Sequence, residues 1–425
     1  MKKSLGIILY SMLLWSCQLC AQQKSVLFIG NSYTGYNNLP QMVANVAIST
    51  GDTLNIDSYT PGGARLLNHA VNPQTLAKIA SQNWDYVAIQ AQSQEPSWPI
   101  TQVQNDVFPY AAILCDSIRS GSSCSMPLFY MTWGRKNGDA SNCPNWPPVC
   151  TYQGMDSLLS ERYQIMANDN DALVSPVGAV WKYIRANHPG IDLYSPDESH
   201  PSLAGSYAAA CAFYVTILRK DPTAISENAG VSATQAQQIR AAAKAVVYDN
   251  LLQWNIGAYD PIADFSFSRT GSTVNFTNQS VKSAQYLWFF GDGDSSSLEH
   301  PTHNYLNQGN FTVTLDAISC GQFSVHTDTV SIVMSVQEND PSNLVRVFPN
   351  PVSDVLEIDL TQMHNSELSQ LEMFDLQGRS VWEEPVQSSK LTLFVKVGSF
   401  PAGWYFIKIS STNETILTRK IEVVH

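Results

Sequence analysis

Two short segments place side chains that could cleave a covalent bond by nucleophilic attack. The first, Gly30-Asn31-Ser32, follows directly on the apolar run 26–29, which has the composition of a buried strand. A serine at the end of a parallel strand can project its hydroxyl into a crevice, and its main-chain N–H can face a developing oxyanion. Gly30 leaves room for the tight turn. The alternative is that Asn31 and Ser32 only form a turn or a helix cap, so a second segment must support the nucleophile.

The second segment, Pro196-Asp197-Glu198-Ser199-His200-Pro201, immediately precedes a helical pattern rich in small residues. An aspartate three residues before a histidine lets the carboxylate reach the imidazole Nδ1 while Nε2 faces a nucleophile. A solvated capping loop is the alternative. Two other histidines lie in this part of the chain. His188 falls in a turn and His69 in a helical pattern, where a solvated or core-edge ring is expected, so His200 is the candidate base.

The elements that must position these residues alternate along residues 22–256. The expected strands are short apolar runs at 25–29, 53–57, 85–90, 127–132 and 173–174. The expected helices lie at 39–49, 154–167, 202–218 and 233–253. Alternating strands and helices predict a three-layer α/β/α sandwich around a parallel sheet, with ligands beyond the carboxyl ends of the strands. Ser32 follows the first of these strands.

The two segments, in this order and at this spacing, resemble the first and last sequence blocks of the SGNH (GDSL-like) hydrolase superfamily over about residues 24–220. The resemblance implies a flavodoxin-like sheet and ester hydrolysis through an acyl-enzyme. It also implies Ser32 as nucleophile, Asp197 and His200 as its partners, and neither a metal nor a cofactor.

The middle blocks of the family are less regular in this chain. The stretch 59–64 resembles the glycine block, whose main-chain N–H donates to the oxyanion, and either Gly62 or Gly63 could carry it. Where the family usually has Gly-x-Asn-Asp, this chain has Gln92-Ser93-Gln94-Glu95. Alignment from Asp85 puts Gln94 on the asparagine, and its amide can donate in the same way, one methylene further out. A register shift of two residues would make Gln92 the donor instead.

The helical period disappears after about residue 260, and alternating runs predict a small β-sandwich up to about 333. The stretches 288–294, 300–305 and 309–315 resemble the PKD (polycystic-kidney-disease) repeat. Within it, Asp292-Gly293-Asp294 could suggest a calcium site, but a turn with solvated carboxylates is favoured because a full set of oxygen ligands is missing.

A third segment, from about residue 345, contains Phe348-Pro349-Asn350-Pro351 and further alternating strands. Its motif order resembles the type A C-terminal sorting domain of the type IX secretion system. That resemblance implies passage through the outer membrane by the secretion machinery, followed by removal of the domain or anchoring at the surface. The alternative is an Ig-like sandwich without an address function. We therefore expect two small all-β sandwich domains, at 257–336 and 337–425, after the catalytic domain at 22–256.

The amino-terminal residues have the three-part layout of a secretory signal peptide, cleaved after Ala21. Lipidation at Cys17 is the alternative, disfavoured by the bulky Trp15 two positions before it. No later stretch is long and apolar enough to span a membrane. The net charge of −12 argues against binding to nucleic acid or to anionic membranes.

Six cysteines follow the signal peptide, in what we expect to be an oxidising compartment. Cys143 with Cys150 and Cys115 with Cys124 are the expected disulfide loops, and a zinc site lacks paired C-x-x-C spacing. The first pair lies in a long loop between Trp133 and Tyr152, which could either shape substrate binding or stay clear of it.

These patterns together favour a secreted or surface-held carboxylic ester hydrolase acting on acylated polysaccharide or a small ester. A surface binding or adhesion protein on an inactive SGNH scaffold is the alternative from another class, supported by the unusual block 92–95. A lipase is the alternative within the enzymes, although no amphipathic helix resembles an interfacial lid.

Overall fold

The computed structural model describes residues 21–333, 345–361, 368–386, 392–411 and 415–425. The chain divides into two compact units, with the division after Val333. The expected signal peptide, the alternative at Cys17 and the expected boundary at 336/337 all concern residues outside this description. Within the described residues, no helix is long and apolar enough to cross a lipid bilayer.

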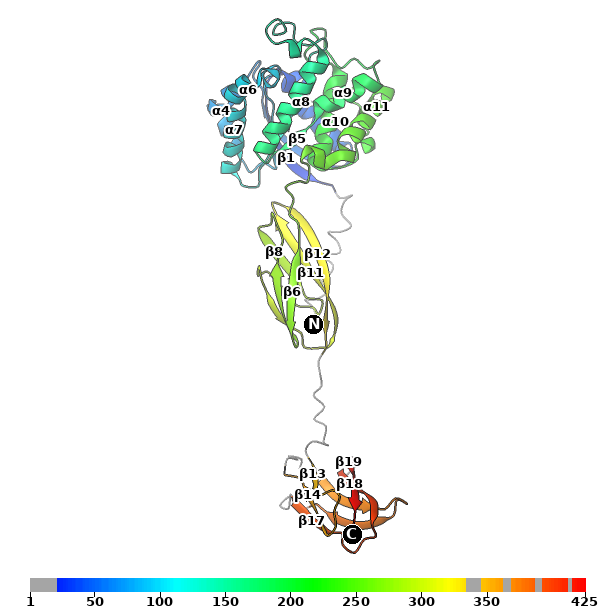
Figure 1. The fold of residues 1–425 in the computed structure, drawn as a ribbon. Helices are drawn as coiled ribbons and strands as arrows, with labels where there is room; N and C mark the ends of the chain where they lie inside the picture. Colours follow the sequence, from blue (N-terminus) through cyan, green and yellow to red (C-terminus); the bar gives the residue numbers. More distant parts are fainter. Residues whose placement is uncertain (1–20, 334–344, 362–367, 387–391, 412–414) are drawn as a thin grey trace. The chain divides into compact units, whose positions relative to one another are not determined.

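A five-stranded parallel sheet forms the centre of the first unit and confirms the expected α/β architecture (Figure 1). Its strands are β1 (Gln23–Ile29), β2 (Thr53–Tyr59), β3 (Tyr86–Ile89), β4 (Met126–Tyr130) and β5 (Leu173–Ser175). They pair in the order β2-β1-β3-β4-β5, which is the flavodoxin-like order. The order reverses beside β1, so the segment after β1 opens into the crevice where such sheets bind ligands.

Helices cover both faces of this sheet. The helices of the described chain here are α2 (Ser32–Gly35), α3 (Leu39–Ile48), α4 (Leu66–Val71), α5 (Pro73–Ile79), α6 (Ile100–Asp106), α7 (Phe108–Gly121), α8 (Tyr152–Asp169), α9 (Val177–Asn187), α10 (Leu203–Leu218) and α11 (Ala233–Val246). Helix α10 is buried on nearly every side, as its run of small and apolar residues requires. The helix expected over 233–253 is shorter than predicted. It ends at Val246, and a 3₁₀ segment, η6 (Tyr248–Trp254), follows.

The rest of the first unit is an antiparallel β-sandwich, as expected. One sheet pairs β10 (Thr302–Asn304), β7 (Thr273–Asn278) and β6 (Phe265–Thr270). The other pairs β12 (Gln322–Ile332), β11 (Gly309–Ser319), β8 (Gln285–Phe289) and β9 (Ser295–Ser296). Trp288, Phe276 and Tyr305 are buried between the sheets.

The second unit is also all-β and has its own core. Its smaller sheet pairs β13 (Arg346–Phe348), β14 (Val355–Asp359) and β17 (Thr392–Lys396). Its larger sheet pairs β16 (Ser380–Pro385), β15 (Leu368–Phe374), β18 (Gly403–Ser411) and β19 (Thr415–Val423). Leu356, Met373 and Ile407 are among the residues that fill this core.

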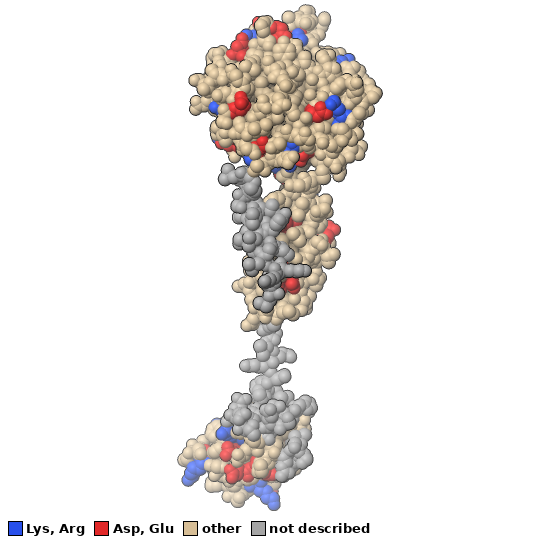
Figure 2. Space-filling model, turned by 180° about the vertical axis from the view of Figure 1, so that it is seen from behind, with Lys and Arg blue, Asp and Glu red and all other residues tan. Residues whose placement is uncertain are grey.

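Charged side chains are sparse on the described surface. Figure 2 shows acidic and basic residues interspersed on one face, without a continuous basic area among the described residues drawn there. This distribution agrees with the negative net charge.

Candidate active site

Ser32 is the first residue of α2, directly beyond the carboxyl end of β1. Asn31 caps this short helix, because its side chain accepts a hydrogen bond from the Tyr33 N–H at 3.0 Å. The capping interpretation of the sequence therefore holds for Asn31. It leaves the Ser32 hydroxyl free to point elsewhere, and Ser32 Oγ lies 2.8 Å from His200 Nε2.

A buried glutamine holds the turn that carries Ser32. Gln90 follows β3, is fully buried, and accepts hydrogen bonds at 2.9 Å from the Asn31 N–H and from the Thr34 hydroxyl. A Cβ on Gly30 would lie 2.6 Å from the Gln90 side-chain oxygen. This close approach requires glycine at position 30, so the turn is fixed by packing as well as by hydrogen bonds.

Asp197 holds the imidazole of His200. The Asp197 carboxylate accepts a short hydrogen bond from His200 Nδ1, and its second oxygen accepts from the main-chain N–H groups of Ser199 at 3.0 Å and His200 at 2.9 Å. Burial raises the pKa of Asp197, but these hydrogen bonds outweigh it and hold the pKa below its ordinary value. An ionised Asp197 can only accept, so Nδ1 carries a proton and Nε2 is free to accept one from Ser32.

Aromatic rings pack around the histidine. The His200 ring stacks on Tyr36 at 4.6 Å between centroids and meets Tyr33 edge-on at 5.3 Å. Tyr33 in turn stacks on Trp133 at 4.9 Å, and the Trp133 indole N–H donates to the Ser199 carbonyl at 3.1 Å. The Tyr33 hydroxyl also lies 2.6 Å from Ser199 Oγ. The rings thus tie the loop 196–201 to both α2 and the end of β4.

The glycine block forms a turn beside Asn31. The Ala64 N–H donates to the Pro61 carbonyl at 3.2 Å, and Gly63 has a φ of 69°, which favours glycine. Asn31 Nδ2 donates to the Ala64 carbonyl at 3.0 Å and so joins this turn to the Ser32 segment. Within the described chain, the N–H groups of Gly62 and Gly63 have no hydrogen-bond partner.

The two glutamines of the third block make different contacts. Gln92 Oε1 accepts from the main-chain N–H groups of Gln94 at 2.7 Å and Glu95 at 3.2 Å, so this side chain closes the loop. Gln94 instead donates its amide N–H to the buried carboxylate of Asp139 at 2.7 Å. Buried Glu95 forms an ion pair with Arg65, directly after the glycine block.

The other two histidines of this region do not join the constellation. His69 is buried rather than solvated, with Nε2 2.9 Å from the Gly30 carbonyl and Nδ1 3.0 Å from Thr75 Oγ1. Burial lowers the pKa of His69, and the hydrogen bond to Gly30 only partly opposes this effect. His69 therefore stabilises the turn before Ser32 through its contact with the Gly30 carbonyl. His188 caps the end of α9.

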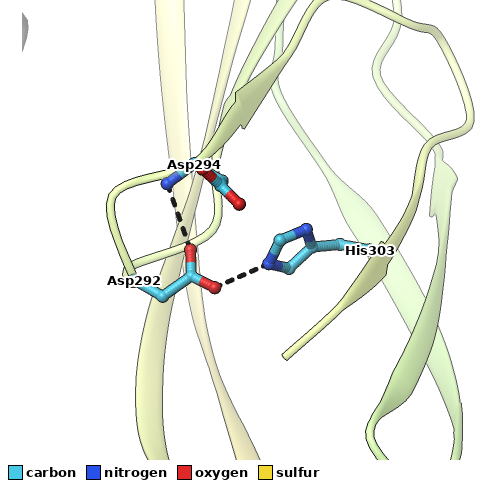
Figure 3. Close-up of side chains that lie close together, drawn as sticks. All are labelled: Asp292, Asp294 and His303. Atoms are coloured by element: carbon cyan, nitrogen blue, oxygen red, sulfur yellow. Dashed lines mark hydrogen bonds and ion pairs between the residues drawn. The ribbon is translucent and has the colours of Figure 1, made fainter. Parts of the chain in front are cut away.

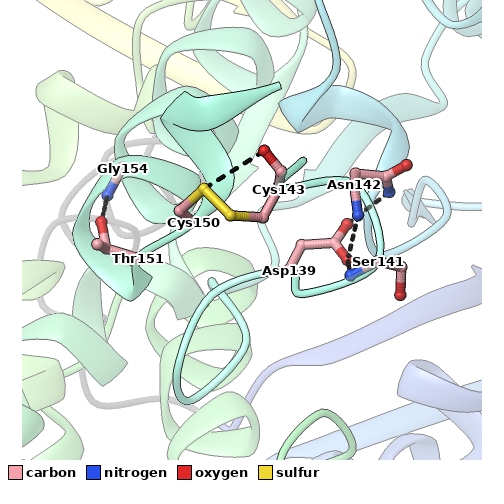
Figure 4. Close-up of a disulfide and its surroundings, with 7 residues drawn as sticks. All are labelled: Asp139, Ser141, Asn142, Cys143, Cys150, Thr151 and Gly154. Carbon is pink, nitrogen blue, oxygen red and sulfur yellow. Dashed lines mark hydrogen bonds between the residues drawn. A yellow bond between two sulfur atoms is a disulfide. The ribbon is translucent and has the colours of Figure 1, made fainter. Parts of the chain in front are cut away.

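The disulfides agree with one expected pair and correct the other. Cys143 and Cys150 are bonded (Figure 4). Cys115 is instead a free, buried thiol on α7, and burial raises its pKa to about 12. Cys124 bonds to Cys320, 196 residues away in the turn between β11 and β12. The expected pair was wrong because Cys115 faces the core, whereas Cys124 lies beyond the end of α7.

One group of described side chains could hold a metal ion: Asp292, Asp294 and His303 of the β-sandwich (Figure 3). Asp292 accepts from the Asp294 N–H at 3.1 Å and lies 2.7 Å from His303 Nε2. His303 stacks on Phe290 at 4.2 Å. These contacts hold the Asp292 carboxylate within the protein, whereas the sequence favoured a turn with solvated carboxylates here.

Several residues that position the site were not predicted from the sequence. They share burial or stacking next to the proposed partners, and they are Gln90, Tyr33, Tyr36, Trp133 and Asp139. Gln90 had a usable signal, because it is a polar residue directly after an apolar strand. Asp139 had none, because its partner Gln94 is 45 residues away.

Family models match both β-rich segments. Residues 259–334 match the PKD domain, and residues 346–424 match the secretion system C-terminal sorting domain. The second match indicates export across the outer membrane through the type IX route, so the protein is secreted or attached to the cell surface.

Solved structures show similarity to individual parts of the chain. A DUF4886 family protein from Bacteroides uniformis is 19% identical with a TM-score of 0.46, covering 54% of this chain and 95% of its own. A proposed SGNH hydrolase from Slackia heliotrinireducens is 27% identical with a TM-score of 0.38, covering 46% and 98%. The PKD1 domain of Vibrio anguillarum Epp is 28% identical with a TM-score of 0.17, covering 18% and 96%.

Proposed function

We propose that this exported protein is a serine esterase that hydrolyses carboxylic esters through an acyl-enzyme, with Ser32 as nucleophile, His200 as base and Asp197 as the residue that orients the base. One observation carries the proposal: a continuous chain of hydrogen bonds runs from Ser32 Oγ through His200 to Asp197 at the carboxyl end of β1. This geometry matches the roles of nucleophile, base and orienting acid.

The first half of the reaction forms the acyl-enzyme. Ser32 Oγ attacks the ester carbonyl carbon while His200 Nε2 takes the hydroxyl proton. The carbonyl oxygen becomes an oxyanion in the tetrahedral intermediate. When this collapses, the bond to the alcohol oxygen breaks, and His200 returns its proton to the leaving alcohol.

The second half releases the acid. A water molecule gives a proton to His200 Nε2 and attacks the acyl carbonyl. The intermediate then collapses with cleavage of the bond to Ser32 Oγ, which recovers the proton. Asp197 stays ionised and stabilises the imidazolium that forms in each half.

The oxyanion requires donors with an N–H hydrogen that is not bonded elsewhere. We assign this role to the N–H of Ser32, to the N–H of Gly62 or Gly63, and to the side-chain amide of Gln94. The two glycine N–H groups have no partner among the described residues, which supports their assignment. Gln92 is less suited, because its side chain closes the loop: its oxygen accepts from two main-chain N–H groups, and its nitrogen donates to Gln94 Oε1 at 3.3 Å.

We propose acylated polysaccharide, deacetylated at the surface or outside the cell, as the substrate class. Export and the appended PKD domain support this choice. Tyr36 next to His200 supports it too, because it is 41% exposed and offers an aromatic face to a sugar.

The test is a screen of p-nitrophenyl acetate, a long-chain p-nitrophenyl ester and acetylated xylan with wild type and Ser32→Ala. Turnover of the acetyl substrates that is lost in Ser32→Ala supports the proposal. Preference for the long chain would indicate a lipase. If wild type turned over none of them and Ser32 did not react with a fluorophosphonate, a binding or adhesion role on this scaffold would replace the esterase.

A further inference from the structure

The loop between β4 and α8 contains a carboxylate that the proposed reaction does not use. Asp139 is fully buried and accepts hydrogen bonds from Asn142 Nδ2 at 2.6 Å and Gln94 Nε2 at 2.7 Å, with Arg135 Nη1 at 3.4 Å. Burial raises the pKa of Asp139, but these hydrogen bonds and the Arg135 charge outweigh it and lower the pKa. Asp139 is therefore ionised and can only accept hydrogen bonds.

This acceptor determines which way the Gln94 amide faces. Gln94 Oε1 accepts from Gln92 Nε2 at 3.3 Å, while Gln94 Nε2 donates to Asp139. A donor at one end and an acceptor-only group at the other specify a single orientation of the amide. The amide nitrogen carries two hydrogens, so one N–H remains for a ligand after the bond to Asp139 is made.

The main chain of Asp139 is held by the segment that the Cys143–Cys150 disulfide closes (Figure 4). The Asp139 N–H donates to the Val149 carbonyl at 2.7 Å, and the Cys143 N–H donates to the Asp139 carbonyl at 2.9 Å. A Cβ on Gly138, whose φ is 88°, would lie 2.6 Å from the Cys150 carbonyl carbon. The disulfide therefore closes the segment against which Asp139 is packed.

We infer that Asp139 is a positioning residue for ester hydrolysis: it orients the Gln94 amide so that the second N–H faces the oxyanion, and the disulfide-closed segment 143–150 keeps Asp139 in place. The inference rests on the proposed esterase function and on Gln94 as a donor. It assigns a role to the long loop without placing the loop in contact with substrate.

The first test is Asp139→Asn, which keeps the size of the side chain but can also donate, so the Gln94 amide can turn over. We expect kcat for p-nitrophenyl acetate to fall by about tenfold with KM nearly unchanged, less than the hundredfold to thousandfold typical for complete loss of an oxyanion donor. Asp192→Asn is the matched control. It removes the exposed ion pair between Asp192 and Lys136, and Lys136 lies in the loop that also contains Asp139. This variant should leave kcat unchanged.

A double-mutant cycle separates this role from a structural one. In a Gln94→Ala background, Asp139→Asn should lower kcat by less than about twofold, because the group that it orients is gone. Equal losses from Asp139→Asn with and without Gln94 would overturn the inference. So would an unchanged kcat in a folded Asp139→Asn protein.

The disulfides provide a second pair of variants, which also serves if Asp139→Asn does not fold. Cys143→Ser/Cys150→Ser should lower kcat, again without further loss in the Gln94→Ala background. Cys124→Ser/Cys320→Ser removes the other disulfide and should lower Tm while kcat stays the same. Equal effects of both disulfide variants on kcat would contradict the role of segment 143–150. If Ser32→Ala remained active, the esterase proposal itself would fail, which is a different outcome.

Discussion

Two parts of the candidate site, the loop with Asp197 and His200 and the third block with Gln94, are held by different kinds of interaction. On one side, the hydrogen bond that orients the His200 ring comes from Asp197, three residues away, while Trp133 and Tyr33 hold the surrounding loop through Ser199. In the third block, Gln94 is fixed by the buried carboxylate of Asp139, 45 residues away, whose main chain is bonded to the disulfide-closed segment 143–150. The contact that orients the proposed base thus joins neighbouring residues of one loop, whereas the contact that orients the proposed oxyanion donor depends on how a distant loop folds.

The largest expected effect concerns the triad side. Ser32→Ala should lower hydrolysis of p-nitrophenyl acetate by about ten-thousandfold or more, because the nucleophile is lost while little packing changes. Ser117→Ala, which removes a hydroxyl bonded within its own helix, is the control. Circular dichroism should show that both variants are folded. Substantial turnover by folded Ser32→Ala would refute the nucleophile assignment.

The next effect concerns the third block, residues 92–95. Gln94→Ala should lower kcat by about a hundredfold to a thousandfold with little change in KM, because an oxyanion donor acts in the transition state. Gln92→Ala is the comparison, since its side chain closes the loop instead. If Gln92→Ala gave the larger loss of kcat, the donor would be Gln92. If both variants kept the wild-type rate, the glutamines would be structural.

A smaller effect is the dependence of turnover on pH. Protonated His200 cannot accept the Ser32 proton, so turnover should fall by about tenfold for each pH unit below the ionisation of the imidazole. The lowered pKa of Asp197 keeps this carboxylate charged over the neutral and mildly acidic range. Its contribution to folding stability is present at neutral pH and is lost only as the pH falls through that lowered pKa. A kcat/KM profile with two ionisations on the acid side would contradict this assignment.

The smallest expected effect on turnover comes from the second unit. Deletion from Val345 onward should leave kcat and KM unchanged, because the site residues all lie in the first unit. The sorting domain match predicts that the truncated protein stays in the periplasm. Cell fractionation with activity assays would measure this, and normal appearance of the truncated protein outside the cell would contradict it.

The sequence predicted the architecture well where the apolar pattern alone defines a helix or a strand. The strands of the parallel sheet are apolar runs that end in turns, and the structure has strands at all five expected places. The end of the helix at Val246 was not predictable in the same way, because apolar spacing continues into η6. There the backbone of Asn250 leaves the helical region with a φ of −140°.

In the candidate site, contacts between nearby residues were predictable from the sequence, and contacts between distant segments were not. Asp197 and His200 are three residues apart, so their contact follows from the local chain, and the structure places the His200 ring beside Ser32. The contact between Gln94 and Asp139 and the bond between Cys124 and Cys320 join distant segments. Such contacts depend on how loops fold over the sheet, which spacing along the chain does not encode.

The Cys124–Cys320 bond has a consequence for survival among extracellular proteases. It links α7's end to the turn between β11 and β12, with the whole connection to the β-sandwich contained between the two cysteines. A single proteolytic cut in that connection would divide the polypeptide without releasing the sandwich. Nicked protein should therefore migrate as two fragments on a reducing gel and as one species on a non-reducing gel.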